Sequence, residues 1–338
     1  MQRLDERDGM GLSRAVFESE LLPTHRPCVL RGLVGHWPGV AVAQQGDMAF
    51  LRWLGQHASA AEVDAVMIPP DQGRRIGYRD GHGPGFNFLR NRLPLGDVLA
   101  QLARYAAHPQ APAVAVQSAL LSSCAPALAL SHGLDLVDAE RAPARLWLGN
   151  AITTPAHLDE SHNLAAVVAG RRRFRLYPPD AVRHLRVGPL GQGPAGTPIT
   201  LVDPDAPGAA HVPGQREAHA LALEGELAPG DAIYIPALWW HEVSSLAPVN
   251  AMINRWWVAP ATAASGLDAL LHTLLALHQR PAAERAAWRS LFEHWVFGAA
   301  PESFAHLPPG LRGLHDGLTA DQAAAVRALL QRGLTSPP

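Results

Sequence analysis

Residues 153–179 read TTPAHLDESHNLAAVVAGRRRFRLYPP, and this stretch combines a pair of potential ligands with two strand-like runs. His157 and Asp159 are two positions apart. Residues two apart in a β-strand point to the same face, so both side chains can point into the interior of a β-barrel. An apolar run follows, then three arginines at 171–173 and a double proline. A basic patch therefore follows closely on a potential metal-binding pair.

A metal held by His157 and Asp159 needs a third ligand from a distant part of the chain. The segment PGDAIYIPALWWHEVSS, residues 229–245, supplies His241 after a strand-like run and a proline turn. Two histidines and one carboxylate on one side of a metal form the ligand set of non-haem Fe(II) oxygenases, and leave the opposite positions open. An H-x-D pair alone is weak evidence, because such pairs are more often surface or capping residues.

The central part of the chain has the pattern of an all-β domain. Between residues 113 and 258, short apolar segments recur with turn residues between them, which favours a sandwich or barrel. Residues 186–218 form a long stretch rich in Gly and Pro, and loops of that length are often functional lids or binding segments. The apolar segments are AVAVQS, ARLWLGN, NLAAVVAG, RFRLYPP, HALALEG, DAIYIP, HEVSSL and NAMINRWWV.

The flanking regions differ from this pattern. The first hundred residues mix a short strand ending at Gly32, a helix with Asp47 as its expected N-cap, and a helix over 94–106. From residue 263 the apolar period is helical, and Thr319 is the expected N-cap of a last helix. We therefore expect an N-terminal α/β extension, a β domain and C-terminal helices, with the bounds 1–112, 113–260 and 261–338.

Composition excludes several classes of protein. The chain has 338 residues, 48% of them hydrophobic, with a net charge of −2, so charge gives no argument for nucleic acid or an anionic membrane. Cys28 and Cys124 form no C-x-x-C motif, which favours a reducing compartment. The N-terminus lacks the apolar segment of a signal peptide, and no apolar run reaches the roughly 20 residues of a membrane span. A cytoplasmic location without membrane partners is expected.

Four motifs in order give the chain a family resemblance. TPAHLDESHN, GRRRFRLYPP, GDAIYIPALWWH and NRWW resemble the signature of the JmjC/cupin-8 group of Fe(II)- and 2-oxoglutarate-dependent oxygenases. The resemblance covers residues 153–258 and implies a double-stranded β-helix, the jelly-roll cupin fold, with the α/β extension before it and a helical bundle after it. It also implies that His157, Asp159 and His241 hold catalytic Fe(II).

The resemblance further implies a set of 2-oxoglutarate contacts. Arg172 stands where the family has a lysine, and its guanidinium would bind the distal carboxylate; the alternative is a surface arginine. Asn163 has the alternative of a turn residue, and Trp256 that of a core aromatic. The full expected set is Thr154, Asn163, Arg172, Asn254 and Trp256.

Other positions are less determined. Thr154 lies on the opposite parity to His157, so Pro155 must break the strand alternation locally. The arginines on the other face of the strand from Arg172 are expected to be solvated; they are Arg171, Arg173 and Arg175. A family tyrosine that binds the distal carboxylate has no match, and Gln117 is a candidate on the substrate side.

The implied function is a hydroxylase of a protein side chain or a small molecule. Its co-products would be succinate and CO2, and its partners 2-oxoglutarate, O2 and an unidentified substrate, with no nucleic acid indicated. A metal-binding cupin without oxygenase activity, such as an isomerase or a sensor, and an N-methyl demethylase are the alternatives. Leucine-rich and aromatic helices after residue 263 predict a homodimer.

Overall fold

The computed structural model describes residues 1–79, 85–108, 110–258, 264–298, 304–308, 312 and 319–335. The chain forms two compact units, Met1–Ala259 and Pro260–Pro338. The division at residues 112 and 260 that the sequence suggests stays a prediction. Among the described residues, no helix is long and apolar enough to cross a membrane.

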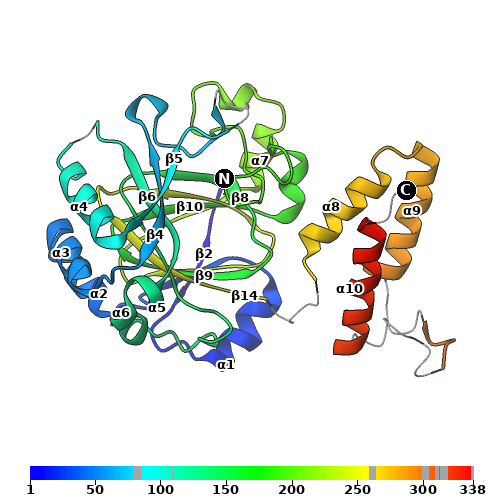
Figure 1. The fold of residues 1–338 in the computed structure, drawn as a ribbon, viewed down its shortest axis with the longest axis horizontal. Helices are drawn as coiled ribbons and strands as arrows, with labels where there is room; N and C mark the ends of the chain where they lie inside the picture. The colour runs from blue at the N-terminus through cyan, green and yellow to red at the C-terminus, as the bar shows by residue number, and fades with distance from the viewer. Residues whose placement is uncertain are drawn as a thin grey trace. The chain divides into compact units, whose positions relative to one another are not determined.

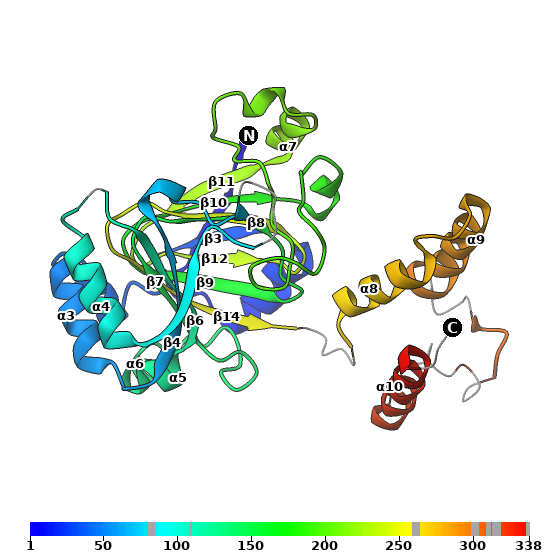
Figure 2. The same cartoon turned by 45° about the horizontal axis from the view of Figure 1, so that its top comes forward.

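The strands of the first unit form two sheets that face one another (Figures 1 and 2). The smaller sheet has the order β1 (Gln2–Arg3), β11 (Leu223–Leu227), β10 (Arg172–Tyr177), β13 (Trp240–Ser245) and β8 (Thr153–His157). The larger sheet has the order β2 (Asp5–Asp8), β3 (Cys28–Arg31), β12 (Ala232–Ile235), β9 (His162–Ala169), β14 (Asn250–Trp257), β7 (Arg145–Gly149), β6 (Ala113–Leu120), β4 (Glu62–Ile68) and β5 (Leu89–Pro94). The expected jelly-roll cupin fold, mainly β with helices toward both termini, is confirmed.

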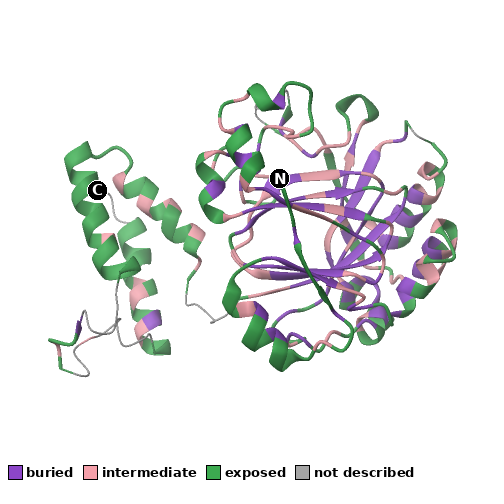
Figure 3. Ribbon diagram, turned by 180° about the vertical axis from the view of Figure 1, so that it is seen from behind, coloured by how far each residue is buried: buried purple, intermediate pink, exposed green. Residues whose placement is uncertain are grey.

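Apolar side chains that alternate along the strands make the core between the sheets. Phe174 and Leu176 of β10 pack with Ile233 and Ile235 of β12 and with Met252 of β14, and all are buried. Most strands are largely buried along their length (Figure 3), whereas β1, β2 and β5 are mostly exposed. Burying each such side chain contributes about 1.5–3 kcal/mol. The two sheets therefore form a stable frame for side chains at the open end of the barrel.

Helices cover the outer face of the larger sheet. Helices α3 (Asp47–His57) and α4 (Leu95–Tyr105) lie beside it with α2 (Pro38–Ala43), α5 (Leu121–Cys124) and α6 (Pro126–Ser131) (Figure 1). Leu54 and Leu102 pack there against Val116 of β6 and Val168 of β9. The segment before residue 113 thus supplies strands β2 to β5 to the barrel sheet as well as covering helices.

The two expected helix caps have different outcomes. Asp47 is not the N-cap of α3: Gly46 takes that place with φ of 111°, and Asp47 is the first helical residue. Glycine adopts positive φ without the steric cost of a Cβ, so the chain turns one residue earlier than a side-chain cap would require. Thr319 does cap α10 (Ala320–Thr335), because its hydroxyl accepts from the Gln322 amide at 3.3 Å.

A buried histidine under the helical layer gives a pH dependence of stability. The Nε2 atom of His132 accepts a hydrogen bond from the Gly39 amide at 3.3 Å, and Nδ1 donates to the Leu128 carbonyl at 3.1 Å. Burial lowers the pKa of His132 below its usual 6.5, although the Leu128 carbonyl acts in the opposite direction. The ring is therefore neutral in the folded protein.

We expect the free energy of unfolding to fall as the pH drops below about 6.5, because the unfolded chain then binds a proton that the folded chain resists. The contribution of His132 is complete above that pH and is lost toward its lower folded pKa. Urea unfolding between pH 7.5 and 5 would measure it, with His132→Gln as the comparison. A variant whose stability depends on pH as steeply as the wild type contradicts this assignment.

The C-terminal unit is helical. It contains α8 (Gly266–Leu277), α9 (Ala282–Phe292) with a π-helical extension over Glu293–Phe297, and α10. Ser265 caps α8 by accepting from the Asp268 amide at 3.1 Å. No residue of α8 or α9 is buried, although both helices carry large apolar side chains. The strong helical period expected after residue 263 is confirmed for these described helices.

Candidate metal centre and cosubstrate pocket

The antiparallel pairing of β8 with β13 brings the two candidate histidines together. His157 and His241 are direct partners in the register, and their ring centroids are 4.2 Å apart. Asp159 follows two residues after His157, and its Oδ2 lies 3.5 Å from Nε2 of His241. One potential ligand atom from each of the three residues lies within 4.8 Å of the others. The structure thus gathers the three residues that the sequence singled out.

Neighbouring groups fix the orientation of these side chains. Nδ1 of His157 donates to the Pro155 carbonyl, and Nδ1 of His241 donates to the Trp239 carbonyl, both at 2.9 Å. Because a carbonyl only accepts, each ring keeps its Nε2 lone pair free for a metal. Asp159 accepts at Oδ2 from the Trp256 indole at 3.0 Å. These are the supports that metal ligands generally have in proteins.

The protonation of His241 also suits a metal ligand. Burial, reinforced by the nearby His157, lowers the pKa of His241 to about 4. The imidazole is therefore neutral at physiological pH, as metal binding requires. Two imidazoles and one carboxylate fit Fe(II), which non-haem oxygenases bind with this set.

A bulge in β8 lets Thr154 and His157 face the same side. The register pairs His241 with His157 and Val243 with Thr154, so β8 has one more residue than β13 in this interval. Pro155 lies in that interval and cannot donate a ladder hydrogen bond. The local break in alternation that the sequence required is present, and Thr154 lines the cavity beside His157 and His241.

The cavity next to the three ligands has a volume of about 90 Å³ and contains all the expected cosubstrate residues. Arg172 is the most informative of them. Its side chain lines the cavity and the residue is only 7% exposed. Its side chain makes no hydrogen bond or ion pair with any residue that the structure describes, and its Nε atom is buried without a partner. The alternative of a surface arginine is therefore wrong.

The charge of Arg172 follows from its surroundings. Burial lowers the pKa of Arg172 to about 10, so the guanidinium is still positive at neutral pH. A buried cation without a counter-ion is unfavourable by several kcal/mol. The place of Arg172 at the start of β10 is set by the turn at Gly170, which has a φ of 72°. Any other residue there would bring its Cβ within 2.4 Å of the Asn250 side chain. The cavity thus holds a fixed positive charge that an anion would stabilise.

Polar side chains from the larger sheet form the opposite wall. Asn254 of β14 donates to the Asn163 side chain of β9 at 3.0 Å and accepts from the Trp147 indole at 2.8 Å. Asn163 is a buried strand residue rather than a turn residue. Trp256 packs edge-on against Trp147 and bonds Asp159, so it has a polar role beyond that of a core aromatic.

Two parts of the cavity wall were not anticipated from the sequence. Trp147 of β7 lines it, although ARLWLGN reads only as a strand. Arg90 and the loop residues Pro194 and Ile199 also line it. Gln117 of β6, a candidate on the substrate side, lies in the wall near Arg172. The strand alternation could have indicated Trp147, but the loop contacts are long-range and leave no local signal.

The arginines on the outer face of β10 are only partly solvated. Arg171 is exposed, with 63% of its side-chain surface accessible, as expected. Arg175 is buried, which the sequence analysis did not predict, and contacts Glu224, Asp205 and Glu242. The prediction failed because strand parity shows which face a residue occupies but not that the 186–218 segment covers this face.

Comparisons with known proteins agree with this arrangement. The Cupin-like domain family matches residues 13–263. The human bifunctional peptidase and (3S)-lysyl hydroxylase JMJD7 is 29% identical to this chain, and the match covers 69% of this chain and 77% of the length of JMJD7. Human HSPB1-associated protein 1 is 36% identical and Arabidopsis thaliana lysine-specific demethylase JMJ31 is 34% identical, each over 33% of this chain. The matches span only 22% and 20% of those two longer proteins.

These findings agree with the four ordered motifs and with the jelly-roll fold. The family match covers more than half of the chain and includes every residue of the candidate centre. The relatives named above include a hydroxylase and a demethylase of the JmjC kind. The chain is a member of the Cupin-like domain family and is similar to JmjC oxygenases.

Proposed function

We propose that this protein is an Fe(II)- and 2-oxoglutarate-dependent oxygenase that hydroxylates a protein side chain or a small molecule. The observation that carries the proposal is the buried Arg172 side chain, which has no hydrogen bond or ion pair among the described residues. It lines the same cavity as His157 and His241, whose potential ligand atoms lie within 4.8 Å of one of Asp159. A metal-binding cupin of another kind has no need for a buried cation beside its metal. A dicarboxylate cosubstrate does need one, because its distal carboxylate requires a counter-charge.

The candidate metal ligands and the polar residues of the cavity each have a definite role in this proposal. His157, Asp159 and His241 hold the Fe(II). Arg172 binds the distal carboxylate of 2-oxoglutarate, with the Thr154 hydroxyl as a second donor. Bound together, Fe(II) and 2-oxoglutarate supply the oxidation of a substrate C–H bond by O2, with succinate and CO2 as co-products.

The remaining polar residues act on position and solvation. Trp256 orients Asp159 through its indole hydrogen bond. Asn163 and Asn254, held by Trp147, present a fixed polar edge toward the cosubstrate. Gln117 lines the same cavity and would lie on the side of the primary substrate. The apolar residues Phe174 and Met252 exclude water around the carboxylate.

The experiment is a succinate-formation assay with Fe(II), 2-oxoglutarate and O2 across peptide and metabolite pools. Mass spectrometry then identifies the molecule that gains one oxygen atom. Loss of a methyl group instead would assign the N-methyl demethylase variant of the same chemistry, which the similarity to a lysine-specific demethylase makes worth testing. Stable metal binding without any turnover of 2-oxoglutarate would support the isomerase or sensor alternative.

We further propose that the protein is a homodimer through its C-terminal helices. Apolar side chains of this unit are exposed to an extent that single chains in water rarely tolerate. They include Leu270, Leu274, Leu275, Trp288, Leu291, Trp295, Val296 and Phe297. Figure 3 shows α9 as almost wholly exposed and α8 as a mixture of exposed and intermediate residues.

Light scattering on the full chain should give twice the mass of 36.1 kDa at micromolar concentration. The same protein ending near residue 260 should be monomeric, because it lacks the exposed apolar surface. A full-length protein that stays monomeric contradicts the proposal. A dimer that persists after truncation places the interface on the first unit instead.

A further inference from the structure

The segment over residues 186–201 forms a hairpin that covers part of the cavity, and we call it the roof hairpin. Its two arms are paired: the Gly188 amide donates to the Ile199 carbonyl at 2.8 Å, and the Leu201 amide donates to the Arg186 carbonyl at 2.7 Å. Four of its residues, Pro194, Ala195, Thr197 and Ile199, line the cavity. The roof hairpin therefore forms part of the wall of the cavity that also contains His157 and His241.

Only a few bonds join the roof hairpin itself to the barrel. The Thr200 amide donates to the Ala156 carbonyl at 2.9 Å, next to His157. At the tip, Arg90 of β5 donates to the Pro194 carbonyl at 3.0 Å. A glycine-rich hairpin with so few bonds needs a stronger anchor to keep one position.

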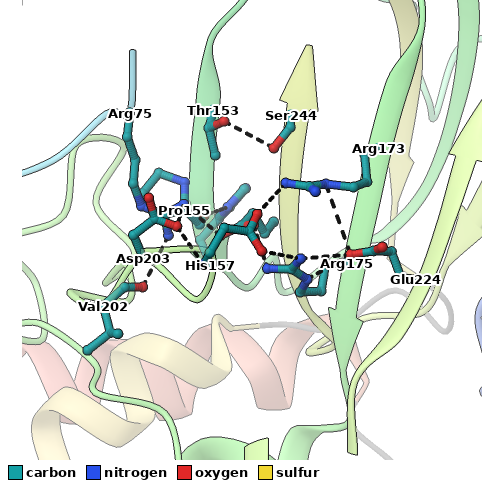
Figure 4. Close-up of polar contacts among 12 residues, drawn as sticks. Arg75, Thr153, Pro155, His157, Arg173, Arg175, Val202, Asp203, Glu224 and Ser244 are labelled. Atoms are coloured by element: carbon teal, nitrogen blue, oxygen red, sulfur yellow. Dashed lines mark hydrogen bonds and ion pairs between the residues drawn. The ribbon is translucent and has the colours of Figure 1, made fainter. Parts of the chain in front are cut away.

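That anchor is an ionic cluster immediately after the roof hairpin. Asp205 contacts Arg175 at 2.8 Å and Arg173 at 2.5 Å. Both arginines belong to β10 and are labelled in Figure 4. Arg75, from the segment after β4, contacts Asp203 at 3.8 Å and donates to the Val202 carbonyl at 3.3 Å. Three arginines thus hold the four residues that directly follow the roof hairpin, residues 202–205.

Glu242 links the two halves of this cluster. One carboxylate oxygen lies 2.8 Å from Arg75, and the other lies 3.4 Å from Arg175. The side chains of Glu242 and Arg175 are only 2% and 5% exposed, so water screens their interaction weakly. Glu242 follows His241 on β13, and its side chain is on the outer face of the strand. Strand β13 thus carries the candidate ligand His241 on one face and the anchor residue Glu242 on the other.

We propose that Asp203 and Asp205 are positioning residues, which hold the roof hairpin in the position that binds the primary substrate. The effect on substrate binding rests on the proposed oxygenase function. The anchoring of the roof hairpin by Asp203 and Asp205 does not depend on that function. Their carboxylates make charge-assisted hydrogen bonds with arginines that Glu242 already fixes, so little side-chain entropy is lost on docking. Neither residue lines the cavity, so their effect on the reaction passes through the roof hairpin.

Hydrogen exchange tests the structural part on the metal-free protein. In the double variant Asp203→Asn/Asp205→Asn, the Thr200 amide, which donates to the Ala156 carbonyl of the barrel, should exchange at least about tenfold faster, the ratio that loss of one charge-assisted bond gives. The amides of β9 and β14 serve as the internal reference. Asp205→Glu keeps the charge and should exchange close to the wild-type rate.

Glu226→Gln is the matched control. Glu226 pairs with Arg171 at the exposed start of the same β10 surface, and its side chain pairs with no residue of the 186–218 segment in the part of the chain that the structure describes. Roof-hairpin exchange should stay at the wild-type rate in this variant. Equal exchange in the double variant and the control overturns the proposal. A general loss of stability in the double variant would make the β9 amides exchange faster as well. In that case the single Asp205→Asn variant is compared with the wild type by the ratio of roof-hairpin exchange to β9 exchange. A ratio equal to that of the wild type overturns the proposal.

Steady-state kinetics test the catalytic part. With a primary substrate from the pool assay, the double variant should raise the KM for that substrate at least about fivefold and leave the KM for 2-oxoglutarate within about twofold. A general loss of structure would change both constants, whereas this split is specific to the roof hairpin. Equal increases in both constants overturn the positioning role. An absence of all turnover in the wild type would contradict the proposed function, while the exchange result would still decide the anchor.

Discussion

Alanine at His157 or at Asp159 should abolish Fe(II)-dependent turnover of 2-oxoglutarate. Each substitution removes one of three groups whose ligand atoms lie within 4.8 Å of one another. The fold should survive, because neither side chain belongs to the apolar core. Anaerobic calorimetry with Fe(II) should show that binding is lost together with turnover, while circular dichroism stays unchanged.

Trp256→Phe provides a graded comparison. This variant keeps the aromatic packing against Trp147 but removes the hydrogen bond to Asp159. Loss of such a supporting bond typically lowers metal affinity or activity about 10- to 100-fold. Glu226→Gln, which changes only an exposed ion pair, should match the wild type. Undiminished turnover in His157→Ala or Asp159→Ala would remove this metal assignment.

Arg172→Met should weaken 2-oxoglutarate binding far more than it weakens Fe(II) binding. Losing a buried charge-assisted contact leaves the distal carboxylate unpaired, at a cost of about 2–5 kcal/mol, or roughly 30- to 5,000-fold in affinity. Titration of 2-oxoglutarate into the Fe(II)-loaded wild type and variant, without O2, would measure the difference. Arg172→Lys restores the charge and the family residue, so it should recover part of the affinity.

The same substitution has a second readout that needs no cosubstrate. Arg172 is a buried cation without a partner among the described residues, and its removal relieves a desolvation cost. The metal-free Arg172→Met protein should therefore unfold at a temperature equal to or above that of the wild type. A marked loss of stability would mean that Arg172 has a structural role in the free protein. An unchanged 2-oxoglutarate affinity would point to a different cation.

The sequence predicted which residues meet in the cavity better than it predicted what surrounds them. The H-x-D pair and His241 were recognisable because they occur in ordered motifs, and strand alternation correctly placed Arg172 on the inner face of β10. Strand alternation alone does not predict the bulge at Pro155, because a bulge depends on the partner strand. The break was expected only because the family pattern places Thr154 on the same side as His157. Strand alternation also misjudged Arg175, whose burial depends on Asp205 and Glu242, residues 30 and 67 positions away.

The helical segments show the same limit in a simpler form. The apolar period located α3, α4 and the C-terminal helices, but it did not decide between Gly46 and Asp47 at the start of α3. A side-chain cap and a glycine with positive φ both begin a helix, and the neighbouring packing selects between them. What covers the exposed apolar side chains of α8 and α9 is likewise a property of the assembly, so it must be measured.

The most direct test of the central claim is succinate formation from 2-oxoglutarate by the purified protein, with Fe(II) supplied or chelated and with the substrate pools present. The account predicts succinate only with Fe(II) and O2, none with His157→Ala, and a strongly raised 2-oxoglutarate requirement with Arg172→Met. Succinate formation that persists after chelation, or that is equal in these variants and the wild type, would contradict it.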